Sequence, residues 1–322
     1  MDLVGESESI VLVAINCDRL RNLCKIASDR RSPATLRMCV CAANDPATHN
    51  WPLETFHYFP DKDLAIASAA AYGIILNIIG YRIWRRKSYW GWLAPTAAGL
   101  LATGFSLRYY MVKDSPDTLA LNYLSQIFLV APAAGYLIFN YTVYRKILDT
   151  FATGRDRYSL LPAKLTFWGL TASTLVAFVL QGAGAGLRAT PDNQSTGRIL
   201  FLAGVIVSAL VYGVFITFLV HSQMVFRNDL KFDRSNFPWL LLYVLYASSL
   251  AIVIRTIYRL AELGQGNDGE LATHEKYFYA LDVLPLACAI TIYAIFWPGS
   301  LIAKASAQEP AVQMSTTGAY RV

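Results

Sequence analysis

Charged side chains are scarce in this sequence. Asp, Glu, Lys and Arg make up 16% of its 322 residues, whereas apolar residues make up 55% and the mean hydropathy is positive. Soluble domains average about 25% charged residues. The scarcity of charge therefore excludes an ordinary soluble domain and indicates a chain that folds in a lipid bilayer.

Signatures of ATP-driven pumps and of common hydrolases are missing. The sequence has no G-x-x-x-x-G-K-[ST] loop, no H-E-x-x-H pair and no G-x-S-x-G turn. His274 and Glu275 begin like a zinc-peptidase motif, but Phe278 stands where the second His belongs. The last apolar segment has no interior lysine to hold retinal. These absences argue against an ATP-driven pump and a retinal protein, and we expect neither a cofactor nor a metal ion.

Long apolar runs are what the sequence does have. A transmembrane helix needs about 20 predominantly apolar residues, and evenly placed polar breaks divide the chain into such runs. No run alternates apolar and polar residues as a barrel strand does, and an open sheet leaves unpaired edges in lipid. The sequence predicts an all-α integral membrane protein, a seven-transmembrane-helix bundle. The predicted helices span residues 64–83, 91–112, 121–144, 165–187, 199–222, 238–258 and 277–300.

Lys and Arg concentrate in every second connection between these helices, and basic loops stay on the cytosolic side. The N-terminus is therefore expected outside and the C-terminus in the cytosol. Topology also explains the net charge of +6, so no nucleic-acid partner is expected, although the basic loops offer a surface for a cytosolic partner. These loops contain Arg82, Arg85, Arg86 and Lys87, then Arg145, Lys146, Arg155, Arg157 and Lys164, then Arg227, Lys231 and Arg234.

The sequence divides into three regions. Residues 1–63 are expected to form a weakly structured extracellular leader, residues 64–301 the membrane domain, and residues 302–322 a disordered cytosolic tail. Outside the cell, the leader cysteines could form two disulfides in any of three pairings, with a zinc site as the alternative. Asn193 opens a glycosylation sequon in an outward connection. The leader cysteines are Cys17, Cys24, Cys39 and Cys41.

The informative polar residues lie around the last two predicted helices. Arg255, Arg259 and Glu262 share one helical face, and Glu275, Tyr279 and Asp282 share another. Because a short connection makes the two helices antiparallel neighbours, guanidinium groups can face carboxylates. One interpretation is an ion-pair clamp that only fixes helix packing. The other is a polar pocket for a lipid headgroup, since ionisable groups inside a membrane are usually paired or functional.

Small and uncharged polar residues mark the third and fourth predicted helices. Gly182, Gly184 and Gly186 follow Gln181 and would let another helix, or a flat ligand, approach the backbone. Gln126 and Gln181 could hydrogen-bond across the bundle or line a pathway. We include all five in the candidate ligand-binding set. Arg108, near a predicted helix end, is expected to extend its guanidinium group to the interface.

Residues around the last two helices carry a family resemblance. The stretch 254–262 reads Ile-Arg-Thr-Ile-Tyr-Arg-Leu-Ala-Glu, and Tyr279-Ala-Leu-Asp282 follows it. With Gln126 to Pro132 and Gln181 to Gly184, this pattern resembles the fungal RTA-like family, also called the lipid-translocating exporters. The resemblance covers residues 58–301. Two departures mark a divergent member: Thr174 stands where the family usually has an acidic residue, and Trp297 where it usually has His.

The resemblance implies a fungal plasma-membrane or endomembrane protein linked to resistance against amphiphilic compounds. We expect a transporter, translocase or resistance factor for an amphiphilic lipid such as a sterol analogue or a sphingoid base. One alternative is a seven-helix lipid sensor that regulates membrane lipid asymmetry. Another is an intramembrane enzyme, a cyclase or isomerase, with a buried carboxylate as general acid. Membrane lipids or amphiphilic small molecules are the expected partners.

Overall fold

A computed structural model describes residues 61–114, 119–151, 160–188, 193–228, 239–266 and 269–303. Almost all of the predicted leader lies outside these residues, including the four cysteines proposed to form disulfides. The predicted tail beyond residue 303 and the loop residues Arg155, Arg157, Lys231 and Arg234 also lie outside them. All described residues belong to one compact unit, residues 55–322.

The described residues form helices and contain no β-strand. A π-helical turn, η5, is continuous with α11 before it and α12 after it, so these three form one long helical segment. The elements are α4 (Lys62–Arg86), the short η2 (Tyr89–Gly91), α5 (Leu93–Asp114), α6 (Leu119–Phe151), α7 (Ala163–Arg188), α8 (Gln194–Asn228), α9 (Trp239–Gln265), α10 (Glu270–Thr273), α11 (Glu275–Phe278), η5 (Tyr279–Val283) and α12 (Leu284–Ile295).

Six helical segments among the described residues are long and apolar enough to cross a membrane. They are α4, α6, α7, α8, α9 and the segment that runs from Glu275 to Ala303. The predicted helix over 91–112 exists as α5, but α5 is not among these six. Polar residues are spread along α5, among them Thr96, Thr103, Ser106 and Arg108. The protein is therefore a multi-pass membrane protein with six candidate spans in its described part.

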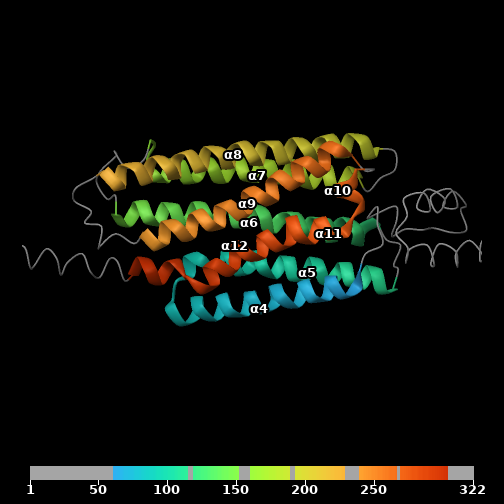
Figure 1. Cartoon of the computed structure of the whole chain (residues 1–322), viewed down its shortest axis with the longest axis horizontal. Coiled ribbons are helices and arrows are strands. Elements are labelled where there is room, and N and C mark those ends of the chain that lie inside the picture. Colours follow the sequence, from blue (N-terminus) through green and yellow to red (C-terminus); the bar gives the residue numbers. More distant parts are fainter. Residues whose placement is uncertain are drawn as a thin grey trace, which may run out of the picture. The chain divides into compact units, whose positions relative to one another are not determined.

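The helices pack in pairs that follow the chain. Figure 1 shows α7 and α8 side by side along one edge of the view and α4 and α5 along the opposite edge, with α6, α9 and α12 between them. Large aromatic residues such as Tyr72, Phe139 and Phe215 are buried between helices. Apolar side chains on the outside remain exposed, for example Val179 and Leu210. Exposed apolar residues on long helices are what a lipid solvent requires.

Glycine residues bring α7 and α8 into close contact. A Cβ added at Gly184 or at Gly197 would lie under 3.0 Å from backbone atoms of the facing helix. A Cβ added at Gly204 would meet Ala177 and Gln181 at similar distances. Small residues allow this approach because packing, and not the hydrophobic effect, drives helix association in lipid. The α7–α8 pair is thus joined backbone to backbone.

Two buried side chains, Asn140 and Trp297, connect separate parts of the bundle by hydrogen bonds. Asn140 of α6 is completely buried and accepts hydrogen bonds at Oδ1 from the hydroxyls of Tyr293 (2.7 Å) and Ser248 (3.3 Å), and its Nδ2 donates to Tyr212 (3.1 Å). We call these four residues the Asn140 hub, which connects α6, α8, α9 and α12. Trp297 donates from Nε1 to Ser88 (3.0 Å) beyond the end of α4.

The end of α9 and the connection after it contain Gly264, Gly266 and Gly269, the G-x-G-x-x-G spacing of dinucleotide-binding loops. That spacing indicates a phosphate loop only where it follows a strand and opens a helix. Here it begins inside the helix α9, and Gly266 has a φ of 91°, a left-handed conformation that glycine adopts readily. Gly266 therefore serves a turn toward the four-residue α10.

Candidate functional site

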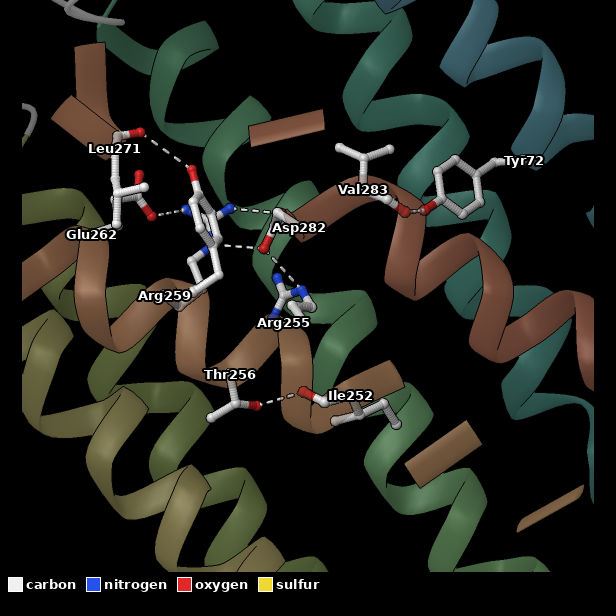
Figure 2. A network of polar contacts seen from close by, with 10 residues as sticks. Tyr72, Ile252, Arg255, Thr256, Arg259, Glu262, Leu271, Asp282 and Val283 are labelled. Atoms are coloured by element: carbon white, nitrogen blue, oxygen red, sulfur yellow. Dashed lines mark hydrogen bonds and ion pairs between the residues drawn. The ribbon is translucent and has the colours of Figure 1, made fainter. Parts of the chain in front are cut away.

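Two arginines of α9 meet one carboxylate of η5. Arg259 donates from Nε and Nη2 to the two oxygens of Asp282, at 2.7 and 2.8 Å, and from Nη1 to Glu262 at 3.0 Å. The Nε of Arg255 lies 3.0 Å from Oδ1 of Asp282. Figure 2 shows both guanidinium groups turned toward Asp282. We call Arg255, Arg259, Glu262 and Asp282 the charged cluster; the expected facing of arginines and carboxylates between the last two helices is present in it.

Local sequence explains the geometry of the charged cluster. Arg255 and Arg259 are four residues apart, so α9 presents both on one face. Asp282 lies on a π-helical turn, in which the N–H of Leu284 bonds to the carbonyl of Tyr279, five residues back. Pro285 has no N–H to donate, which weakens the α-helical pattern at this point. The hydroxyl of Tyr72 donates to the carbonyl of Val283 (2.8 Å) beside the wider turn.

The charged cluster is buried inside the helix bundle. The side chains of Asp282 and Arg255 are 6% and 11% exposed, and those of Arg259 and Glu262 are 16% and 20% exposed. Charges this far from water are costly unless they are paired and hydrogen-bonded. Bidentate pairing between Arg259 and Asp282 meets that requirement.

Glu275 and Tyr279 make contacts with α5, although the sequence placed them on one face with Asp282. Glu275 instead pairs with Arg108 of α5, with 3.3 Å between Nη2 and Oε1. It also accepts a hydrogen bond from the backbone N–H of Asp61 (2.8 Å). Tyr279 stacks on Phe105, with 6.2 Å between the ring centroids. These contacts tie α11 and η5 to α4 and α5.

The expectation that Arg108 extends to the interface was wrong. Its side chain is 2% exposed, and Glu275 lies within ion-pair distance. Its guanidinium carbon also lies 4.9 Å from the centroid of the Phe278 ring, and that of Arg259 lies 5.5 Å from the same centroid. Guanidinium groups over an aromatic face gain electrostatic attraction. Phe278 therefore connects the Arg108–Glu275 pair to the charged cluster.

A cavity of about 30 Å³ lies between α6, α7, α8 and α9, with Leu286 of α12 in its wall. Most of the wall is apolar, with Phe178 and Val205 as examples. At this volume the cavity holds about one or two water molecules. Its polar lining residues are Thr174, Gln181, Ser208, Arg255, Thr256 and Arg259. The interior cavity, as we call it, thus combines an apolar wall with two guanidinium groups.

The other predicted site residues have varied positions. Gln181 lines the interior cavity and donates from Nε2 to the carbonyl of Gly204 (3.1 Å). Gln126 is half-buried on α6 and does not line it. An added Cβ would meet α8 at Gly184 and the Tyr123 ring at Gly186, whereas space is open at Gly182. At Gly184 and Gly186 the structure thus favours helix packing over room for a ligand. Asn193 is exposed just before α8.

Sequence reasoning missed several residues of the interior cavity. Thr174 and Phe178 were missed, although they lie seven and three residues before the candidate Gln181 on α7, a spacing that could have placed them on its face. Thr174 drew notice only as a departure from the family pattern. Ser208 and Thr256 gave no comparable signal. Among the described residues no group of three or more His, Cys, Asp or Glu could hold a metal ion.

Comparison with known proteins relates the sequence of this chain to one family. The profile described as RTA1 like protein matches residues 96–305. The sphingoid long-chain base transporter RSB1 of Saccharomyces cerevisiae is 29% identical over 280 residues, 74% of this chain and 72% of the relative. No solved structure matches.

Two further yeast relatives match over shorter stretches. Protein RTM1 of Saccharomyces cerevisiae is 29% identical over 171 residues, 52% of this chain, and protein RTA1 is 27% identical over 203 residues, 61% of this chain. The chain spans 54% and 61% of the lengths of these two relatives. Because the family profile matches well over half of the chain, including the charged cluster, the protein belongs to the RTA1-like family.

Proposed function

We propose that this protein moves an amphiphilic lipid across the membrane, with the charged cluster and the interior cavity as its headgroup site. The observation that carries the proposal is the position of Arg255 and Arg259, which are buried in the bundle and line a cavity. Buried ionisable residues in membrane helices commonly mark substrate pathways. The distant relationship to a transporter of sphingoid long-chain bases supports a lipid substrate.

We further propose the seven-span topology, with α5 as the span that completes it. Helix α5 packs between α4 and α6, and its 22 residues are long enough to cross the hydrocarbon. The described ends of α4, α6 and α8 carry Arg85, Arg86, Arg145, Lys146 and Arg227. These ends would face the cytosol, with residues 1–63 outside and residues 302–322 inside. In this scheme the charged cluster lies toward the exterior.

Transport by the purified protein is the direct test. Proteoliposomes that contain the full chain would receive a fluorescent single-chain amphiphile, and a membrane-impermeant quencher would report how much of it changes leaflet. We expect faster movement than in protein-free liposomes. Equal rates in the two preparations would refute translocation and leave a sensor or an enzyme as the alternative.

A double variant separates a headgroup site from an ion-pair clamp. Arg255→Met with Asp282→Leu removes one charge of each sign and leaves Arg259 paired with Glu262 at 3.0 Å. Because no unpaired charge remains, we expect normal amounts of folded protein but transport reduced at least tenfold. The matched control is Arg145→Met with Asp149→Leu, which removes a more exposed ion pair. Full transport by the first variant would mean that its charges serve packing alone.

A further inference from the structure

We infer that the interior cavity accepts an anionic headgroup of the phosphate class, and not the ammonium group of a free long-chain base. The inference rests on the proposed function, because it names the ligand chemistry of the same site. It starts from the signs of the charges that the cavity exposes. Arg255 and Arg259 line it, and none of the described residues in its wall is Asp or Glu.

The carboxylates of the charged cluster are occupied by the arginines. Both oxygens of Asp282 accept hydrogen bonds from Arg259, at 2.7 and 2.8 Å. Glu262 accepts from the same guanidinium group at 3.0 Å. An ammonium group entering the interior cavity would therefore meet two cations before it met a carboxylate. A phosphate would meet the guanidinium groups directly.

Arg255 has donors to spare. Its Nε lies 3.0 Å from Oδ1 of Asp282, and that oxygen already accepts a hydrogen bond from Arg259. The Nη groups of Arg255 have no hydrogen-bond partner among the described residues. A guanidinium fork binds phosphate oxygens bidentately. Arg255 is thus the residue that the structure leaves available for an anion.

The rest of the wall suits the atoms next to a phosphate. Gln181, Ser208 and Thr256 supply uncharged polar groups, and apolar side chains such as Phe178 and Leu286 suit the first methylene groups of a chain. The empty cavity, at about 30 Å³, has room for one or two water molecules, which a bound phosphate would displace. A ligand that binds the folded protein stabilises it, and a melting-temperature measurement detects that stabilisation.

Binding to the purified full chain in a maltoside detergent tests the ligand chemistry. The probes are dodecyl phosphate, dodecylamine and inorganic phosphate. We expect dodecyl phosphate to raise the melting temperature in a saturable manner, and dodecylamine and inorganic phosphate to leave it unchanged. A larger saturable shift with dodecylamine would overturn the inference. If inorganic phosphate bound as tightly as dodecyl phosphate, the conclusion that the ligand is a lipid would be overturned, because the site would then hold a free anion.

Variants locate the binding. Arg255→Gln removes the fork but leaves Asp282 bonded to Arg259, so we expect folded protein whose dissociation constant for dodecyl phosphate is at least tenfold higher. Arg255→Lys keeps the positive charge but not the guanidinium fork, so its dissociation constant should lie between those of the native protein and of Arg255→Gln. This variant replaces Arg255→Gln in the test if the Gln variant is unstable. The control is Arg198→Gln, since Arg198 donates to the carbonyl of Leu263 (2.7 Å) and does not line the cavity. Unchanged affinity in both Arg255 variants would overturn the site.

The transport assay keeps this inference separate from the proposed function. Movement of a fluorescent alkylamine, without movement of the matching alkyl phosphate, would leave the translocase standing and refute the anionic headgroup. Absence of movement for both amphiphiles would refute the translocase. Binding of dodecyl phosphate that depends on Arg255 would still support the anion site in that case.

Discussion

The charged cluster and the Asn140 hub are two buried polar networks of different chemistry in one bundle. Along α9, the cavity-lining residues 252–259 lie between Ser248 of the hub and Glu262 of the cluster. The hub contains only neutral groups, each with a hydrogen-bond partner. The cluster contains four charged side chains that are unequally paired: Arg259 is hydrogen-bonded to both carboxylates, whereas Arg255 contacts Asp282 through Nε. A neutral, fully bonded network favours fixed packing, whereas a cation with spare donors favours a ligand.

Removing the shared carboxylate should have the largest effect. Asp282→Leu leaves Arg255 without its carboxylate and Arg259 with Glu262 alone, and breaking a buried pair in this way costs about 3–5 kcal/mol of stability. Thermal denaturation of purified protein, with membrane abundance beside it, measures this loss. Asp149→Leu, at a more exposed ion pair, should cost about 0–1 kcal/mol. Equal losses for the two variants would mean that burial does not distinguish these pairs.

Replacing Asn140, the central residue of the hub, should reduce stability less than Asp282→Leu does. Asn140→Leu leaves the hydroxyls of Tyr212, Ser248 and Tyr293 without this partner, but no charge is stranded. We expect a loss of about 1–3 kcal/mol, measured by the same denaturation. Because the hub does not line the cavity, the dissociation constant for dodecyl phosphate should change less than in Arg255→Gln. A loss as large as that of Asp282→Leu would contradict the difference between the two networks.

The smallest expected effect comes from removing one bond of the hub. Tyr293→Phe deletes the 2.7 Å hydrogen bond to Asn140, while Ser248 continues to donate to the same oxygen at 3.3 Å. The net contribution of one such bond is about 0.5–1.5 kcal/mol. Tyr243→Phe on the exposed surface of α9 is the control and should be neutral in denaturation. A stabilised Tyr293→Phe variant would show that the bond is strained.

Sequence patterns predicted the helices well because apolar runs bounded by polar residues determine them. The predicted segment 165–187 is found as α7 (Ala163–Arg188). The patterns underestimated the lengths of α6 and α8, which reach Phe151 and Asn228. Both helices continue past their apolar runs into polar residues, and hydropathy cannot locate a helix end among polar residues. Hydropathy likewise does not make α5 a span, so the count of seven rests on its length and its packing.

The candidate site was predictable where its residues lie close in the sequence. Arg255, Arg259 and Asp282 belong to consecutive antiparallel segments, and helical spacing brings them together. The pairing of Arg108 with Glu275 joins residues 167 positions apart, so it depends on how α5 packs against α11. The π-helical turn at Tyr279–Val283 was also invisible. It leaves Glu275 and Asp282 with different arginine partners, although α-helical spacing predicts a shared face.

The glycine contacts between α7 and α8 have a consequence for motion. Two helices joined backbone to backbone have no compressible side-chain layer between them, so they must translate and rotate as one body. One wall of the interior cavity is therefore stiff. Any displacement that enlarges it falls to α6 or α9. Helix α9 is tied to α8 on either side of its cavity-lining residues, by hydrogen bonds from Tyr246 to Gln223 (2.5 Å) and from Arg198 to Leu263. With these two points fixed, the stretch of α9 between them would move by bowing or by turning about its own axis, which would swing Arg255 and Arg259 together.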